Sequence, residues 1–291
     1  MAEQSQVYGS SNIGEQPPSS RPYVPGFGAW GLRLMAISYL TVFIVIPLLV
    51  VNVQGLRFGL DVFWQSISRP EAVSALTLSV TTSLVMTVIN TVMGTLTAYV
   101  LVRYKFPGKT LFNTLVDLPF AIPTLVIGVM LVLLYGPQTI VGKFLQQELG
   151  VRILFDTPGI VIALLLVGYP FVIRAVQPVL LQMDSNQTDV AQTIGASPWT
   201  TFRRVIFPII RPAMVTGALL SFARSLGEFG SIIVVAGNIP MRSQTGTVYV
   251  YTQVEAGNMQ AASSVSMVLL LVAFAATIGI DMMNWRRHAR N

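Results

Sequence analysis

Cysteine is missing from this 291-residue chain, and histidine occurs once, at His288. Without cysteine the chain can form no disulfide, no thiolate metal site and no cysteine nucleophile. One histidine is too few for a histidine-based metal centre and leaves a catalytic triad without its usual base. We therefore expect no catalytic residue, no metal site and no bound cofactor.

Charged residues are scarce as well, at 10% of the chain, where a soluble domain carries about 25%. Hydrophobic residues make up 53%, and the mean hydropathy is +0.66. The chain also has no G-x4-G-K-[ST] phosphate-binding loop, so it cannot hydrolyse ATP itself. These features predict an all-α protein with several membrane spans, and the net charge of +6 follows the membrane rather than a nucleic acid.

About six apolar windows can each cross roughly 30 Å of hydrocarbon at about 1.5 Å per residue. They lie at 34–56, 72–102, 115–135, 159–180, from Pro212 onward, and up to about Asp281. We expect Pro47 to kink the first of them. The chain then divides into a flexible tail (1–33), a transmembrane domain (34–285) and a short basic tail (286–291).

Lysine and arginine predict the orientation of these spans. They gather in the two tails, in the turn 103–109 and in the polar stretch 184–212, all of which lie on one side of a six-span chain. Because basic residues stay in the cytoplasm, we expect both termini and the 184–212 stretch to be cytoplasmic.

The 184–212 stretch is the longest polar interruption in the second half of the chain, and it predicts two short helices. Asp184 can cap the first helix together with Gln187, and Ile194-Gly195 can end it, with the glycine in a left-handed conformation. Ser197 and Pro198 then have the residue types preferred at the N-cap and at the first position of a second helix.

The second helix has an apolar face formed by Trp199, Phe202 and Val205, with Arg203 and Arg204 outside it. Pro208 and Pro212 are expected to end it. The two aromatic residues can fill a groove of a cytoplasmic partner, or they can pack back onto the chain's own spans.

Polar and helix-breaking residues inside the spans are further candidates for function. Arg224 and Glu228 are four residues apart, so they can pair on one helix face as a structural or gating pair, or Arg224 can contact a transported anion. Pro119 and Pro123 break regular helix, as a packing kink or as part of a gate. Arg174, near a span end, can snorkel toward water. The serines and threonines of 72–102 suit close helix packing better than a path lining.

The polar stretch also resembles the cytoplasmic loop of ABC importer permeases, E-A-A-x3-G-x9-I-x-L-P. The matching positions are Asp189, Val190, Ala191, Gly195, Val205, Phe207 and Pro208, and four of them differ from the pattern, with Asp for Glu, Val for Ala, Val for Ile and Phe for Leu. The resemblance implies a type I importer permease fold. It also implies an ATPase-coupling site formed by Asp189, Ala191, Gly195, Ser197, Trp199, Phe202, Arg203 and Pro208.

Other segments resemble the T-type subunit of sulfate/thiosulfate permeases. They are 25–28 (PGFG), 103–110 (RYKFPGKT), 117–124 (DLPFAIPT), 170–180 (PFVIRAVQPVL), 221–232 (SFARSLGEFGSI) and 236–245 (AGNIPMRSQT). This likeness implies the plasma (inner) membrane of a prokaryote. The partners it implies are two ATP-binding cassette subunits, a homologous second permease in a heterodimer, an external sulfate-binding protein and membrane lipid, but no nucleic acid.

Three alternatives remain. Parts of 221–232 and 236–245 are shared with molybdate and tungstate permeases, so the cargo can be another tetrahedral oxyanion. An ion-coupled secondary transporter would need carboxylates near the membrane midplane, and the candidates are only Glu228, Asp117 and Asp281, with no visible internal repeat. A membrane enzyme would need a cluster of reactive side chains that the sequence does not offer.

Overall fold

The computed structural model describes residues 27–193 and 195–288, and these residues are helical apart from short connections. The chain separates into two units, one up to Leu49 and one from Val50 to the C-terminus. Five helical stretches are long and apolar enough to cross a membrane, and a bent helix pair makes a sixth. The prediction of an all-α protein with about six spans is therefore confirmed.

The first unit contains the start of the first candidate span, Trp30–Leu56. It comprises α1 (Phe27–Leu40), the π-helical turn η1 (Thr41–Val45) and the first residues of α2 (Ile46–Leu56). The Ile46 N–H donates to the Thr41 carbonyl, five residues back. This wider turn comes directly before Pro47, whose ring would crowd the carbonyl four residues back in a regular helix.

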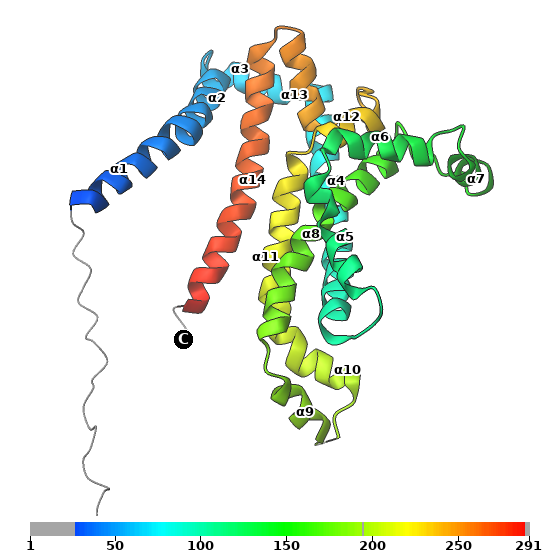
Figure 1. Cartoon of the computed structure of the whole chain (residues 1–291). Helices are drawn as coiled ribbons and strands as arrows, with labels where there is room; N and C mark the ends of the chain where they lie inside the picture. Colours follow the sequence, from blue (N-terminus) through cyan, green and yellow to red (C-terminus); the bar gives the residue numbers. More distant parts are fainter. Residues whose placement is uncertain (1–26, 194, 289–291) are drawn as a thin grey trace, which may run out of the picture. The chain divides into compact units, whose positions relative to one another are not determined.

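The second unit contains the remaining helices in this order: α3 (Leu60–Ile67), α4 (Pro70–Arg103), α5 (Lys109–Ala121), α6 (Thr124–Tyr135), α7 (Ile140–Glu148), α8 (Thr157–Gln182), α9 (Ser185–Thr193), α10 (Pro198–Thr201), the π-helical turn η2 (Phe202–Ile206), α11 (Phe207–Leu226), α12 (Gly230–Ala236), α13 (Gly246–Glu255) and α14 (Met259–His288). Helices α4, α8 and α11 run side by side (Figure 1), and the contacts of α8 with α4 and with α11 are the most extensive of the unit.

Glycines let these three helices approach closely. A Cβ on Gly94 of α4 would lie 2.9 Å from the Val172 Cβ of α8, and one on Gly217 of α11 would lie 2.8 Å from the Val172 Cα. Because real Cβ atoms do not come so near, neither position accepts a larger residue without separating the helices. The helix α8 is thus enclosed from both sides, and Val172, Ile173 and Val176 are fully buried.

Several serines and threonines of α4 belong to this packing, whereas Thr77 and Thr81 are exposed. Ser79, Thr82 and Ser83 are buried, and the Thr82 hydroxyl donates to the Leu78 carbonyl of its own helix at 2.6 Å. Asn90 is also buried, and its amide donates across to the Leu165 carbonyl of α8 at 3.1 Å. The packing interpretation of this polar window is the one that the structure supports.

One predicted helix boundary is wrong. Pro208 and Pro212 do not end the helix that begins at Pro198, because α10, η2 and α11 form a single helical stretch, Pro198–Leu226. The Phe207 N–H donates to the Phe202 carbonyl, five residues back. A π-helical turn again comes directly before a proline, as at Pro47. The fifth span therefore has no start at Pro212.

Candidate coupling segment and intramembrane ion pairs

The described residues of the predicted coupling loop 184–212, called the coupling segment below, form a helical corner. Figure 1 shows α9 and α10 together at one end of the second unit, next to the ends of α8 and α11. Helix α9 begins directly after Asp184, as predicted, and Ile194, the expected end, lies outside the described residues.

The chain then turns at Gly195 and starts again at Ser197. Gly195 has φ +81°, which confirms the predicted left-handed conformation, and the Ala196 N–H donates to the Ala191 carbonyl at 3.0 Å. The Ser197 hydroxyl accepts from the Thr200 N–H at 3.2 Å, which confirms the predicted N-cap ahead of Pro198. Both turning points of the segment thus follow from local residue chemistry.

The two aromatic residues of the segment behave differently. The Phe202 ring packs edge-on against Tyr99 of α4 at a centroid distance of 5.8 Å, so Phe202 contacts the chain's own spans. Trp199 stacks on the Phe202 ring at a centroid distance of 5.8 Å, and Trp199 is 68% exposed. Trp199 is therefore the aromatic residue available to a partner, and its ring packs on Phe202.

The other residues of the predicted coupling site present a mixed polar surface. Asp189, Ser197, Arg203, Arg204 and Pro208 are exposed, whereas Ala191 is buried. The surface around Trp199 thus carries two guanidinium groups from the π-helical turn.

The predicted pair of Arg224 and Glu228 is present, with Arg224 Nη1 2.8 Å from Glu228 Oε2. It does not lie on one helix face, however, because α11 ends at Leu226 and Glu228 stands in the break before α12. The Glu228 side chain is 1% exposed. Its Oε1 accepts from the Ser231 N–H at 3.1 Å and from the Ser231 hydroxyl at 3.0 Å, so the carboxylate also satisfies donors in the first turn of α12.

Two helix breaks adjoin at this place. Pro119 lies inside α5, and Pro123 stands between α5 and α6, which are bent by 111°. A Cβ on Gly230 would lie 3.0 Å from the Leu125 N–H nitrogen at the start of α6. The structure therefore brings the break at Pro123 against the break that contains Glu228.

A second ion pair was not expected from the sequence. Arg174, expected to be able to snorkel, binds Asp117 of α5 through two hydrogen bonds, from Nε at 2.7 Å and from Nη2 at 2.5 Å, and its side chain remains 30% exposed. Nη1 donates to the side-chain oxygens of Asn113 at 3.1 Å and Gln177 at 2.5 Å. The sequence offers one signal for this cluster, namely opposite charges in two different apolar windows.

A third ion pair lies outside the spans, where Arg242 Nη2 approaches Asp156 Oδ2 at 2.9 Å. The hydrogen bond from Arg242, together with the Thr157 N–H that donates to Asp156 at 2.8 Å, lowers the pKa of the Asp156 carboxyl below 3.8. The pair therefore adds stability at pH values above 3.8 and loses that contribution as the pH falls through the lowered pKa.

Known proteins show clear similarity to this chain. Residues 90–285 match the model of the binding-protein-dependent transport system inner membrane component family. A sulfate transport system permease protein CysT of Synechocystis is 37% identical over 89% of this chain and 90% of its own length. The protein of the same name from Salmonella typhimurium is 34% identical over 92% of this chain and 96% of its own length.

Solved structures show the same fold. A chain of a bacterial alginate ABC transporter, crystallised with a pentasaccharide-bound periplasmic protein, has a TM-score of 0.73 at 18% identity and covers 88% of this chain and 93% of its own. A chain of the MetNI methionine ABC transporter in an inward-facing conformation has a TM-score of 0.56, also at 18% identity, with 73% of this chain and 94% of its own covered. The predicted importer permease fold is confirmed.

Proposed function

The chain belongs to the family of binding-protein-dependent transport system inner membrane components, and we propose that it carries sulfate or thiosulfate into the cytoplasm as a membrane-spanning subunit of an ABC importer. The transport energy comes from ATP hydrolysis on separate subunits. The chain itself catalyses no reaction in this proposal.

The observation that carries the proposal is the coupling segment. It combines a left-handed glycine, a capped second helix and an exposed tryptophan beside two arginines. A tryptophan that is 68% exposed is a costly surface residue unless a partner covers it, and buried aromatic anchors dominate the energy of protein interfaces. We propose that the cytoplasmic ATPase is this partner, and that Arg203 and Arg204 pair with carboxylates at the edge of the contact.

The remaining partners and the orientation follow from the same proposal. Two ATP-binding cassette subunits and a second, homologous permease complete the complex, and an external binding protein delivers the anion. The termini and the coupling segment face the cytoplasm, the side on which basic residues are retained.

Sulfate is the proposed cargo because relatives over most of the chain are named sulfate transport system permeases. Molybdate and tungstate have the same tetrahedral shape and double charge, so they are the competing cargoes. An ion-coupled secondary transporter is less well supported, since the buried Glu228 is already paired with Arg224.

The test is uptake of labelled sulfate by the complete importer in proteoliposomes that contain ATP on the ATPase side. We expect uptake that requires both ATP and the binding protein, and that excess thiosulfate inhibits more strongly than molybdate. A Trp199→Ala complex should lose most of this uptake.

Sulfate uptake that proceeds without ATP and follows an ion gradient would replace the proposal with secondary transport. Preferential inhibition by molybdate would change the cargo and leave the importer assignment intact.

A further inference from the structure

Arg174 and Asp117 are charged residues of the spans that the coupling function leaves unexplained. Helix α8 extends eight residues beyond Arg174, to Gln182, which places the backbone of Arg174 about 12 Å from the helix end at about 1.5 Å per residue. Charged groups at such depth in a span face water or protein rather than lipid, because hydrocarbon excludes them. The side chains of Arg174 and Asp117 are 30% and 47% exposed, so water or an anion can reach them from a polar side.

The guanidinium is held from two helices. Asp117 of α5 occupies one edge through Nε and Nη2. Asn113, also on α5, accepts from Nη1 with its amide oxygen and from Nη2 with its carbonyl, and the amide oxygen of Gln177 on α8 accepts from Nη1. If α5 withdraws, Asn113 leaves together with Asp117, Gln177 still accepts from Nη1, and the Nε–Nη2 edge of the guanidinium becomes free.

Helix α5, which carries Asp117, has the means to withdraw. It is joined to α6 by a break with a 111° bend, and it begins after Gly108, whose φ is +80°. Among the described helices, only α8 packs extensively against α5. Its contacts with α8 include the polar cluster, the Phe120–Phe171 ring pair at 5.2 Å, and Val116, which is buried in an apolar cluster with Val172 and Ile173.

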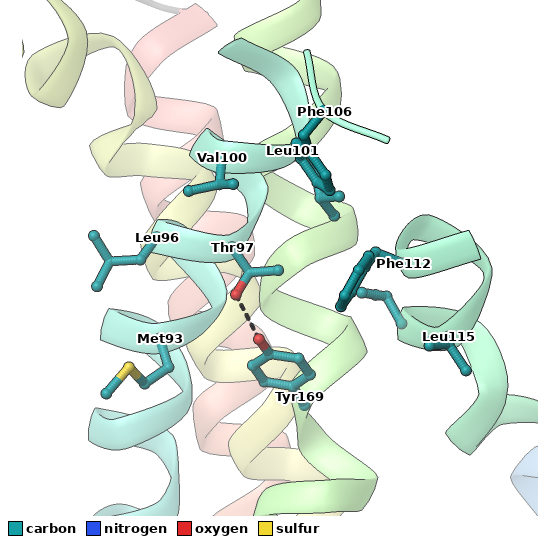
Figure 2. Close-up of a pocket in the computed structure, with 10 residues that line it drawn as sticks. Met93, Leu96, Thr97, Val100, Leu101, Phe106, Phe112, Leu115 and Tyr169 are labelled. Carbon is teal, nitrogen blue, oxygen red and sulfur yellow. Dashed lines mark hydrogen bonds between the residues drawn. The ribbon is translucent and has the colours of Figure 1, made fainter. Parts of the chain in front are cut away.

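A cavity of about 640 Å³ separates α5 from α4. Figure 2 shows Phe112 and Leu115 of α5 on one side of it and Met93 and Leu96 of α4 on the other. Because α5 contributes only apolar side chains to this lining, the cavity offers no hydrogen bond that would keep α5 in place. The polar cluster at Arg174 supplies hydrogen bonds that join α5 to α8.

We propose that Arg174 is an oxyanion-binding residue of the transport path, and that Asp117 competes with the transported anion for the same edge of the guanidinium. A sulfate ion and a carboxylate both offer two oxygens to the paired N–H groups of an arginine. A transport site must also release its anion, and an internal carboxylate that returns to the guanidinium does so without a deep positive well. The inference rests on the proposed function, because it supplies a site for that cargo.

Opposite effects of the two neutral variants test this competition. Asp117→Asn removes the competitor and leaves Arg174, so anion binding should strengthen about tenfold while turnover falls. Arg174→Gln removes the site, so anion binding should be lost. A salt bridge that only clamps α5 to α8 predicts the same change in both variants, because either substitution breaks it.

Binding can be measured by protection of a single cysteine, because the chain has none of its own. Phe120→Cys lies one turn from Asp117 on α5 and is 53% exposed in the native residue. Sulfate should slow its reaction with a maleimide in the complete importer, compared with chloride at equal ionic strength. Leu111→Cys, on the same helix and 62% exposed, should react at the same rate in both salts.

In the Phe120→Cys background, Asp117→Asn should allow protection of the cysteine at an about tenfold lower sulfate concentration, and Arg174→Gln should abolish the protection. Asp156→Asn and Arg242→Gln, which break the ion pair outside the spans, are the matched controls and should leave protection unchanged. Equal behaviour of Asp117→Asn and Arg174→Gln, or no protection by sulfate in a complex that still takes up sulfate, overturns the inference. A native complex that takes up no oxyanion instead overturns the proposed function.

Discussion

At the scale of single residues, Gly195 shows how one backbone conformation determines a functional corner. Its φ of +81° is disfavoured for any residue with a Cβ, although a Cβ there would have nothing within 4 Å. A substitution therefore introduces backbone strain alone, of about 1–2 kcal/mol, and no steric clash.

Gly195→Val should abolish most transport and leave membrane insertion intact, because the strained turn displaces α10 and Trp199 from their positions. Gly195→Asn should retain more uptake, since asparagine tolerates the left-handed conformation. Gly150→Val is the matched control, with φ +65° and equally free surroundings in a loop outside the coupling segment. Sulfate uptake at matched expression is the measurement, and normal uptake by Gly195→Val would contradict the expected role.

The Arg224–Glu228 pair gives a second prediction at this scale. Glu228 is buried and Arg224 is 35% exposed, so the two neutral variants should differ. Arg224→Gln leaves a buried carboxylate without its cation and should destabilise by about 3–5 kcal/mol. Glu228→Gln leaves Arg224, whose side chain can still reach water, so this variant should lose less stability.

The double variant Arg224→Gln/Glu228→Gln should be more stable than Arg224→Gln alone. Thermal unfolding of the purified protein in detergent measures all three, with Arg242→Gln as a control for the loss of an exposed ion pair. Strictly additive losses would show that the two residues act separately.

At the scale of elements, the helix from Pro198 to Leu226 explains how a surface corner is joined to a span. The π-helical turn η2 lets Pro208 stand in a continuous helix, so α10 and α11 do not separate. Phe202 fixes the corner to Tyr99 of α4. We therefore expect a displacement of Trp199 by a partner to move α4 and α11 as well.

This arrangement predicts that alanine substitutions of Trp199 and Phe202 have different effects. Trp199→Ala should weaken binding of the ATPase by about 2 kcal/mol, or roughly 30-fold, with little change in the stability of the chain. Phe202→Ala should lower the thermal stability, because its ring packs on Tyr99 and Trp199. Affinity for the isolated ATPase and unfolding temperature together separate the two effects.

Cysteines introduced at Ser197 and at Thr200 test the contact with the ATPase by crosslinking. Crosslinks to the ATPase that change with nucleotide would support the docking of α10. If neither cysteine reaches the ATPase while both react with a thiol reagent from the cytoplasm, the coupling assignment fails.

At the scale of the whole molecule, the orientation of the spans decides which side meets ATP. We expect the coupling segment in the cytoplasm and the exposed helix α7 outside. In intact cells, Gln147→Cys of α7 should react with a membrane-impermeant maleimide, whereas Ser197→Cys should react only after permeabilisation. The opposite labelling would invert the proposed topology.

The sequence by itself determined the features that depend on neighbouring residues. Apolar windows of sufficient length predict membrane spans, and Gly195, Ser197 and Pro198 set the corner of the coupling segment through backbone conformation and capping. These effects act between residues that are close in the sequence, so they can be predicted from the sequence alone. The loop pattern around Asp189 and Gly195 likewise indicates the family from the sequence alone.

Only the tertiary structure decided the features that depend on distant residues. Asp117 and Arg174 are 57 positions apart, and their pairing exists because α5 packs on α8. Trp199 is exposed whereas Phe202 packs on Tyr99 of another helix, although both aromatic residues belong to the same local sequence pattern. Likewise, Pro208 and Pro212 are expected to end a helix by their own chemistry, but a π-helical turn and the packing of α11 against α8 keep the helix continuous. Contacts between helices can outweigh such local preferences, which is why the sequence alone misplaced that boundary.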